Sequence, residues 1–367
     1  MLTGGHLTPA CAVIDEIQAK HPEWNIVFVG RMHALEGDTA LSQEYRIISQ
    51  KGIPFYPLTM GRLTRVFSFS SVLSILKIPV GFVQSFFLIR KIHPAVVLTF
   101  GGYLAVPIAW WAHMFGIPVV THEQTMSPGL ANRFIARFAD KVLTAFPVLV
   151  SIPGNKYAYV GLPVRKEILD PPKTCSFPVV RGKPILLITG GGAGAQSMNE
   201  RIFPAIKTLI KTYMVIHQTG TASLPHAQSI LDSLPTEDRD SYSIHPYIDA
   251  SDWGWILSHA NLCIGRSGAN TVYEIVLRGV PSVFIPLPWS AGQEQQKNAQ
   301  YLVDNGTAVL LPQEELTSET LLSNIAHLEE NRKQYSDQLL LLQQSFPVDS
   351  AQRVVSVLEE VRASHRV

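Results

Sequence analysis

The sequence predicts an α/β protein built from two doubly wound domains. Apolar segments of strand length alternate with segments of helical pattern through most of the chain, and such alternation is typical of parallel sheets with right-handed crossovers. Several of the apolar segments end in Gly or a polar residue, at the edge where doubly wound sheets bind ligands. The chain has 367 residues, 46% of them hydrophobic, which is enough for two complete cores.

The first half contains four strand-like segments, at residues 25–30, 95–100, 117–122 and 141–146. The chain begins with Leu2-Thr-Gly-Gly-His6 and then a helical pattern from Ala10. A Gly-Gly turn that enters a helix normally follows a strand, so the first strand of this domain is expected to be missing, either because the start is misassigned or because the strand is lost. We expect residues 1–164 to form an N-terminal domain.

A weakly patterned stretch with Pro and Lys runs from Arg165 to Pro184 and predicts an interdomain linker. The strand and helix pattern then restarts at Ile185, with further strands at 214–220, 243–248, 261–265 and 282–286 and a helix at 297–304. We expect residues 165–345 to form a second domain of the same plan. An amphipathic helix in 346–367 is expected to pack back on the N-terminal domain.

Charge is unevenly distributed although the net charge is only +1. No acidic residue occurs between Glu44 and Glu123, and within that interval residues 67–89 are almost wholly apolar. Lys77 and the Pro79-x-Gly81 break argue against a membrane span, so we predict two helices, 70–78 and 82–92, lying partly on an anionic membrane surface. The alternative is a pair of core helices with a solvated basic rim.

The three cysteines are widely spaced and form no metal-ligand pattern, which suggests a reducing compartment. We also expect no signal peptide at the N-terminus, no zinc site and no nucleic-acid patch. Asp238-Arg-Asp240 lies in a charged turn and is interpreted as a solvated loop.

Three glycine-rich turns are candidate anion sites: 3–6, 100–103 and 189–195. Glycine lets the backbone approach a phosphate, and the helix that follows contributes its positive end. The third turn is not a P-loop, because no Lys-Ser/Thr follows it. The alternative for each is a simple tight turn.

The segment Ile264 to Ile275 is the strongest candidate for a nucleotide site. An apolar strand breaks at small residues and a helix follows from Ala269, so the first helical N–H groups could hold a diphosphate. Glu274 lies about one turn further, where its carboxylate could bind vicinal hydroxyls. The alternative is an ordinary strand-turn-helix joint with a surface Glu.

Two further groups suit transfer chemistry. His6 and Glu123 both lie at strand ends of the first sheet and could together deprotonate an attacking hydroxyl, although each could instead be a capping or hydrogen-bonded structural residue. The amides and carboxylate of Gln293 to Asn298 could bind the hydroxyls of a sugar. The alternative for that helix is a solvated face.

Together these motifs resemble the MurG family of N-acetylglucosaminyltransferases, glycosyltransferase family 28. The resemblance covers essentially the whole chain and lies in motifs that occur in the family's order: Gly4-Gly-His-x-x-Pro9, Phe100-Gly-Gly-Tyr103, His122-Glu-Gln124, Pro128-Gly-Leu-Ala-Asn132, Gly161-x-Pro-Val-Arg165, His217-Gln-Thr-Gly220, Tyr247-Ile-Asp249 and Arg266-Ser-Gly-Ala-x-Thr-x-x-Glu274. It implies a GT-B fold, with two Rossmann-like domains facing a cleft that holds the active site.

The resemblance also implies roles for single residues. It makes His6, assisted by Glu123, the catalytic pair, and it places Glu274 on the ribose, Tyr247 and Ile248 near the uracil, and Glu294 and Gln295 at the donor sugar. The remaining implied donor residues are Arg165, Gly191, Gly192, Ala269, Asn270 and Thr271, and the implied acceptor residues are Thr3, Gly4, Gly5, Gly101, Gly102, Tyr103, Gln124 and Thr125. Thr125, Gly192-Ala193 and Asn270 depart from the family's usual residues.

The implied reaction is an inverting transfer of N-acetylglucosamine (GlcNAc) from UDP-GlcNAc to the C4 hydroxyl of the MurNAc of lipid I, which gives lipid II for peptidoglycan synthesis. No metal or cofactor is implied. The implied setting is peripheral, on the anionic cytoplasmic face of the cell membrane, with other cell-wall synthesis proteins as candidate partners. Two alternatives stay open: a related GT-B transferase with another lipid acceptor, and a non-catalytic nucleotide-sugar-binding protein.

Overall fold

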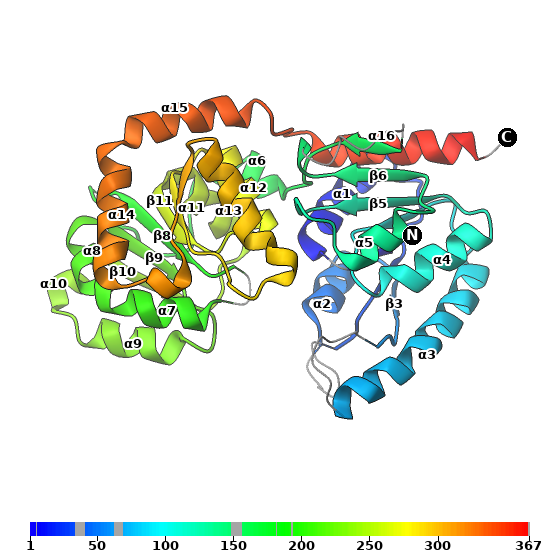
Figure 1. Cartoon of the computed structure of the whole chain (residues 1–367), viewed down its shortest axis with the longest axis horizontal. Helices are drawn as coiled ribbons and strands as arrows, with labels where there is room; N and C mark the ends of the chain where they lie inside the picture. Colours follow the sequence, from blue (N-terminus) through cyan, green and yellow to red (C-terminus); the bar gives the residue numbers. More distant parts are fainter. Residues whose placement is uncertain are drawn as a thin grey trace. The chain divides into compact units, whose positions relative to one another are not determined.

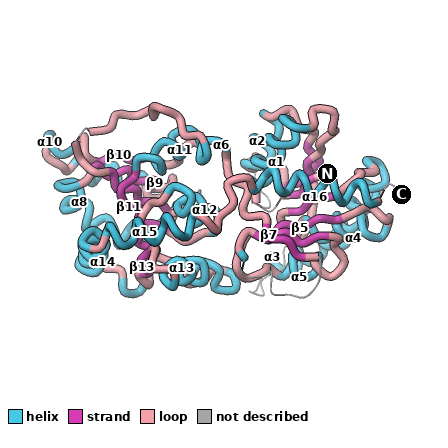
Figure 2. Tube along the Cα trace, turned by 90° about the horizontal axis from the view of Figure 1, so that it is seen from above, coloured by secondary structure: helices cyan, strands magenta, loops and turns pink. Residues whose placement is uncertain are grey.

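The computed structural model describes residues 1–4, 6–33, 41–61, 69–147, 156–180, 182–191 and 194–365, with the side chains of 69–75 left out. Contacts divide the chain into two compact units, which we call unit 1 (Met1–Val164 with Asp349–Val367) and unit 2 (Arg165–Val348). Each unit is a parallel sheet with helices packed around it, as Figures 1 and 2 show. The predicted α/β, doubly wound fold class is confirmed.

Unit 1 has a seven-stranded sheet in the order β3-β2-β1-β4-β5-β6-β7. Its strands are β1 (Leu2–Thr3), β2 (Phe28–Gly30), β3 (Phe55–Pro57), β4 (Val97–Thr99), β5 (Val119–Glu123), β6 (Lys141–Thr144) and β7 (Tyr157–Tyr159). Its helices are α1 (Leu7–Lys20), α2 (Gln43–Gln50), α3 (Phe69–Ile92), α4 (Ala105–Met114), α5 (Leu130–Ile135) and α16 (Ser350–Ser364).

The expected loss of the first strand is wrong. Leu2 and Thr3 form β1 in the middle of the sheet, where they pair with Phe28 and Val29 of β2 on one side and with β4 on the other. A strand of two residues has no alternating pattern to detect. It is held instead by backbone hydrogen bonds to both neighbours and by the burial of Leu2, which is 3% exposed.

The apolar segment of unit 1 forms one helix, α3, rather than the predicted pair. Pro79 lies inside it and lacks the N–H that would bond the carbonyl of Ile75 one turn earlier. Contacts with α4 hold the helix in place after this point. Trp111 of α4 donates its indole N–H to the carbonyl of Phe82 at 2.8 Å, and α3 lies beside α4 in Figure 1. None of the described helices combines the length and the apolar character that crossing a bilayer requires.

Helix α16, near the end of the chain, belongs to unit 1 and packs against α1 (Figure 1). Val354, Val355 and Leu358 of α16 share a buried cluster with residues of α1 and of the sheet. At the rim, Lys20 and His21 contact Glu359. The last helix therefore completes the core of the first unit.

Unit 2 has a six-stranded sheet in the order β10-β9-β8-β11-β12-β13. Its strands are β8 (Ile185–Thr189), β9 (Met214–Gln218), β10 (Tyr242–His245), β11 (Ala260–Gly265), β12 (Ser282–Phe284) and β13 (Ala308–Leu310). Its helices are α6 (Lys166–Leu169), α7 (Gln196–Ile202), α8 (Ile206–Thr212), α9 (Leu224–Asp232), α10 (Thr236–Arg239), α11 (Ala250–His259), α12 (Ala269–Arg278), α13 (Glu294–Asp304), α14 (Ser318–Glu330) and α15 (Arg332–Gln343), with short 3₁₀ turns η2 (Phe203–Ala205), η3 (Ala291–Gln293) and η4 (Gln313–Glu315).

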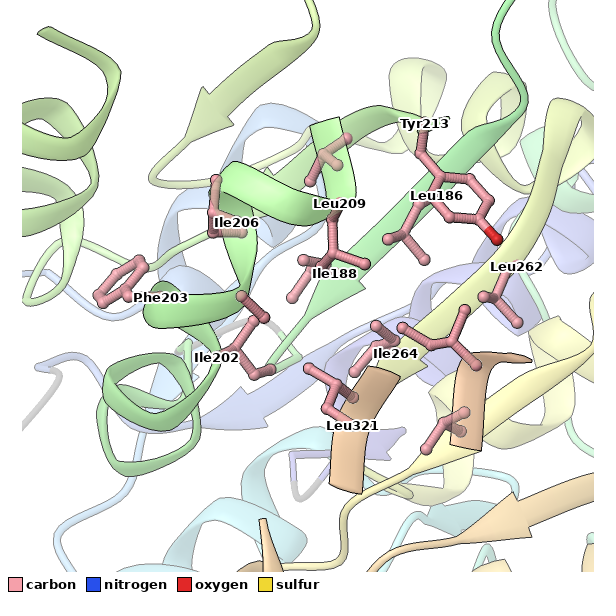
Figure 3. Close-up of a cluster of buried hydrophobic side chains, with 14 of the residues drawn as sticks. Leu186, Ile188, Ile202, Phe203, Ile206, Leu209, Tyr213, Leu262, Ile264 and Leu321 are labelled. Carbon is pink, nitrogen blue, oxygen red and sulfur yellow. The ribbon is translucent and has the colours of Figure 1, made fainter. Parts of the chain in front are cut away.

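One face of this sheet is closed by α7, α8 and α14. Figure 3 shows Ile188 of β8 and Ile264 of β11 meeting Leu321 of α14 within a cluster of buried aliphatic side chains. Strands buried on both faces carry continuous apolar runs, which is why they stood out in the sequence. The core of unit 2 thus fixes the carboxyl ends of β8 and β11, where the glycine turn and α12 begin.

The predicted linker, residues 165–184, is in large part packed on unit 2. Asp252 of α11 accepts hydrogen bonds from the backbone N–H of Ser176, at 2.8 Å, and from the Ser176 hydroxyl, at 2.5 Å. The ring of Phe177 lies 4.5 Å from that of His245. Asp252 lies 76 residues from Ser176 in the chain. The composition of the linker itself therefore gives no sign that it is anchored to unit 2.

Candidate functional site

The glycine turn after β8 is shaped by close backbone contacts. A side chain at Gly190 would lie 2.4 Å from the backbone nitrogen of Ala195, so only glycine lets the turn fold onto the start of α7. Gly191 has φ +81° and donates its N–H to the Thr189 hydroxyl at 3.1 Å. Gly192, the other predicted residue of this turn, lies outside the described residues.

A cavity of about 450 Å³ lies in unit 2 beside this turn. Within it, the side-chain oxygen of Gln295 accepts the backbone N–H of Leu287 at 2.9 Å, which fixes the orientation of the amide. The amide NH₂ of Gln295 is then left as a donor for a ligand. The cavity is lined by Gly190, Gly194, Ala195, Gln196, Ser197, Glu200, Arg266, Leu287, Trp289 and Gln295.

Of the predicted sugar-binding pair, Gln295 lines this cavity, whereas Glu294 is half-buried at the start of α13 and is not among the lining residues. Two side chains of the wall, Arg266 and Trp289, were not predicted as site residues from the sequence, although Arg266 opens one of the motifs that carry the family resemblance. Trp289 is 67% exposed, and an exposed Trp in the Pro-rich loop before Gln293 was the available signal.

Arg266 is the buried cation of this cavity. Its guanidinium donates to the backbone carbonyls of Ile285 and Pro286 at 2.9 and 3.0 Å and to the Ser197 hydroxyl at 3.1 Å. Burial lowers the pKa of Arg266 to about 10, so the side chain stays charged at neutral pH. It supplies a fixed positive charge next to the glycine turn.

The start of α12 is open to an anion. Gly268 is the N-cap, and no side chain caps the helix. Ala269, Asn270 and Thr271 are half-buried in its first turn, and the side-chain oxygen of Asn270 is buried without a hydrogen-bond partner among the described residues. Uncapped N–H groups together with the helix dipole favour a phosphate at this position.

Glu274 lies one turn further, in a buried cluster. Its side chain is 3% exposed and pairs with Arg165, whose terminal nitrogen Nη2 lies 3.2 and 3.3 Å from the two carboxylate oxygens. Trp253 of α11 donates its indole N–H to Glu274 Oε2 at 2.7 Å. Arg165 and Glu274, predicted as donor residues 109 positions apart, are thus brought together, and Trp253 is an additional partner.

The predicted uracil segment joins β10 to α11. Tyr247 is 50% exposed, whereas Ile248 is buried at 4%. Asp249 caps α11 by accepting the N–H of Asp252 at 2.9 Å. An accessible aromatic ring on a capped, fixed turn is suited to stacking on a base.

In unit 1, the first glycine turn connects β1 to α1. Thr3 and Gly4 are buried, and Gly4 donates its N–H to Val29, whereas Gly5 lies outside the described residues. His6 is the N-cap of α1 but makes no side-chain cap hydrogen bond. The capping role that the sequence left open for His6 is therefore not seen.

His6 is exposed as a residue, yet desolvation by the protein around it lowers the pKa of its imidazole. The charge of His6 also lowers the pKa of His122, which burial brings to about 4. His6 thus lies near the end of β5, with a neutral ring at pH 7.

The second glycine turn has two left-handed residues in succession, Gly101 with φ +77° and Gly102 with φ +78°. A side chain at Gly101 would lie 2.9 Å from the amide nitrogen of Asn132. Tyr103 is half-buried and packs against the apolar cluster beneath.

The carboxylate of Glu123 organises the loop between β5 and α5. One oxygen accepts the backbone N–H of Thr125 at 3.0 Å and its hydroxyl at 2.8 Å. The other accepts the amide of Asn132 at 2.8 Å and the backbone N–H of Gly129 at 3.3 Å. With about four acceptor positions on a carboxylate, Glu123 is saturated, which is the hydrogen-bonded structural alternative that the sequence left open.

Four buried side chains at this sheet edge keep polar atoms without a hydrogen-bond partner among the described residues: Thr3, His122, Gln124 and Thr144. Gln124, predicted as an acceptor residue, is 1% exposed, and neither its amide oxygen nor its amide nitrogen has a partner. Buried polar atoms are rarely left unpaired in folded proteins, so this edge has capacity for a polar ligand or water. Among the described residues, no cluster of His, Cys, Asp and Glu could hold a metal ion.

Comparisons with known proteins agree across the chain. Residues 3–144 match the glycosyltransferase family 28 N-terminal domain, and residues 185–354 match the glycosyltransferase family 28 C-terminal domain. A protein of Bacillus cytotoxicus named UDP-N-acetylglucosamine--N-acetylmuramyl-(pentapeptide) pyrophosphoryl-undecaprenol N-acetylglucosamine transferase is 31% identical over 365 residues, 98% of this chain and 97% of that one. A protein of the same name from Shouchella clausii is 32% identical over 91% of this chain and 90% of its own.

Solved structures give the same picture. The crystal structure of Acinetobacter baumannii MurG superposes with a TM-score of 0.71 at 27% identity and covers 98% of both chains. UDP-GlcNAc 2-epimerase from Neisseria meningitidis, bound to UDP-GlcNAc, superposes with a TM-score of 0.65 at 15% identity, over 98% of both chains. The second likeness concerns the fold alone.

Proposed function

The chain belongs to glycosyltransferase family 28, with the GT-B fold, and from this premise we propose that it transfers GlcNAc from UDP-GlcNAc to lipid I to give lipid II. The observation that carries the donor half is the uncapped start of α12 followed by the buried carboxylate of Glu274. Those two features suit a diphosphate and a ribose, one turn apart. The sugar and the acceptor of this proposal are taken from the names of the relatives, which give UDP-N-acetylglucosamine and N-acetylmuramyl-(pentapeptide) pyrophosphoryl-undecaprenol.

In this proposal, the donor lies on unit 2. The N–H groups of Ala269, Asn270 and Thr271 face the diphosphate, and Glu274 accepts hydrogen bonds from the ribose hydroxyls. Gln295 offers its oriented amide to the sugar in the cavity beside the glycine turn. As UDP leaves, negative charge grows on the diphosphate, where fixed N–H dipoles stabilise it most.

The acceptor is bound by unit 1. The C4 hydroxyl oxygen of its MurNAc attacks the anomeric carbon of GlcNAc, the bond from that carbon to the UDP oxygen breaks, and the configuration inverts. His6 takes the hydroxyl proton, because its lowered pKa keeps the imidazole neutral at pH 7. Glu123 acts as a positioning residue, since its oxygens already hold Thr125, Gly129 and Asn132.

The lipid acceptor requires contact with a membrane, for which α3 offers a surface. Leu76, Val80, Val83 and Phe87 are exposed by 45–64% and follow a helical spacing of four, three and four residues, so they form one apolar stripe. Arg90 and Lys91 lie exposed at the end of the same helix, and Met114 and Phe115 are exposed at the end of α4, which packs on α3. An apolar stripe with adjacent cations suits an anionic leaflet, and we place the protein peripherally on the cytoplasmic face of the cell membrane.

The test is a transfer assay with radiolabelled UDP-GlcNAc and two lipid acceptors, lipid I and diacylglycerol. Label in lipid I alone is the expected result. Label in diacylglycerol alone would show a related transferase with another acceptor. UDP binding without transfer to either lipid would show a non-catalytic nucleotide-sugar-binding protein.

A further inference from the structure

The carboxylate of Glu274 is held by two unequal contacts. Trp253 donates to Oε2 at 2.7 Å, a short hydrogen bond of the kind that a charged acceptor forms. Arg165 reaches the carboxylate with one nitrogen only, at 3.2 and 3.3 Å, whereas a paired guanidinium usually uses two nitrogens at about 2.8 Å. The indole is therefore the tighter partner of Glu274.

The fold sets the position of Trp253 through its neighbour Gly254. A side chain at Gly254 would lie 2.1 Å from the backbone oxygen of Glu167 in α6, so glycine lets α11 and α6 touch through their backbones. Trp253, the residue before Gly254, is 5% exposed and donates a hydrogen bond to Glu274 of α12. The same contact keeps Arg165, the N-cap of α6, beside the carboxylate.

Arg165 is the partner that can leave. Its side chain is 24% exposed against 3% for Glu274, and its Nε atom is buried without a hydrogen-bond partner among the described residues. Two vicinal hydroxyls need one acceptor position on each carboxylate oxygen. The single nitrogen of Arg165 is shared between both oxygens, so its departure opens one position on each.

We propose that Trp253 is a positioning residue for the donor nucleotide: its indole N–H anchors Glu274 while the ribose hydroxyls replace Arg165 on the carboxylate. This rests on the proposed function, in which Glu274 binds the ribose. Without the indole N–H, the carboxylate can turn toward Arg165 and lose the orientation that the diol needs. Selection for a ribose over a deoxyribose is then the property that Trp253 controls.

The test compares UDP with 2′-deoxy-UDP by titration calorimetry in wild type, Trp253→Phe and Trp255→Phe. Trp255 is the matched control, because it lies on the same helix, 8% exposed, and stacks on His259 instead of reaching Glu274. Wild type and Trp255→Phe are expected to bind UDP about 10-fold more tightly than 2′-deoxy-UDP. This ratio corresponds to the free energy of one hydrogen bond to a charged group. In Trp253→Phe the ratio is expected to fall toward one, with affinity for 2′-deoxy-UDP changed less than about 2-fold.

The outcomes distinguish the ribose-binding role of Glu274 from the anchoring role of Trp253. If wild type binds both nucleotides equally, Glu274 does not read the ribose, and both its role and the inference fail. If wild type discriminates and Trp253→Phe discriminates equally well, only the inference about Trp253 is overturned. If Trp253→Phe does not fold, benzothienylalanine at position 253, which replaces the N–H by sulfur at nearly the same volume, provides the same comparison.

Discussion

Asn132 donates its side-chain amide to the carboxylate of Glu123 at 2.8 Å, and its amide oxygen accepts the hydroxyl of Thr121 at 3.0 Å. Glu123 is 5% exposed, so each hydrogen-bond donor around it offsets the cost of burying its polar oxygens. Asn132 thereby connects α5 to β5, on either side of the loop between them. The loop carries Thr125, a predicted acceptor residue.

Replacing Asn132 by Ala is expected to disturb the acceptor half and spare the donor half. Loss of a hydrogen bond to a buried charge should lower the unfolding free energy by about 2 kcal/mol, and turnover of the lipid acceptor should fall at least about 10-fold with UDP affinity unchanged. Steady-state kinetics and UDP calorimetry measure the two effects. Asn305→Ala, at an exposed position of unit 2, is the control, and equal turnover in both variants would contradict the role given to Glu123.

The sequence could predict the sheets because their strands are buried on both faces and stand out as apolar runs. It could also place Glu274 on a helix after a strand, because that follows from local pattern alone. It could not predict that Trp253 of α11 reaches Glu274 of α12, 21 residues further along the chain, since the packing of α11 depends on its close approach to α6 at Gly254. The saturation of Glu123 could not be predicted either, because its donors Gly129 and Asn132 come from the N-cap and the first turn of α5.

His6→Ala is expected to reduce turnover by about 100-fold or more, the usual contribution of a general base, while UDP binding stays within about 2-fold of wild type. The pH profile gives a second readout. Burial lowers the pKa of His6, and a base acts when unprotonated, so kcat/KM should rise with pH through a midpoint below 6.5. A comparable loss of UDP affinity in His6→Ala would instead make His6 a structural or donor residue.

The apolar stripe of α3 is expected to carry the binding of the protein to anionic membranes. Val83→Asp with Phe87→Asp places two carboxylates on that stripe, and binding to phosphatidylglycerol vesicles should weaken by about 10-fold or more, because apolar contact is lost and the added charges are repelled. Sedimentation with vesicles measures this. Leu340→Asp with Leu341→Asp on α15, where both residues are exposed by about 60%, should leave vesicle binding unchanged. Equal binding by both double variants would place the lipid contact elsewhere.

His217 predicts an acid-sensitive core in unit 2. It is buried between the Tyr242 hydroxyl and the Asn199 amide oxygen, each at 3.1 Å, and burial lowers its pKa to about 3. The folded form therefore holds His217 neutral, whereas the unfolded chain takes up a proton below about pH 6.5. Stability from this residue is complete above pH 6.5 and is lost as pH falls from 6.5 toward 3.

The measurement is the free energy of unfolding of unit 2 in urea at pH values between 7 and 4.5. Over that range, wild type should lose up to about 1.4 kcal/mol per pH unit more than His217→Gln, which has no proton to take up. His226→Gln, at an exposed position on α9, should keep the wild-type slope. Parallel slopes in wild type and His217→Gln would mean that His217 binds a proton in the folded state as readily as in the unfolded chain, and the polar core around Asn199 and Tyr242 would then have to accommodate a cation.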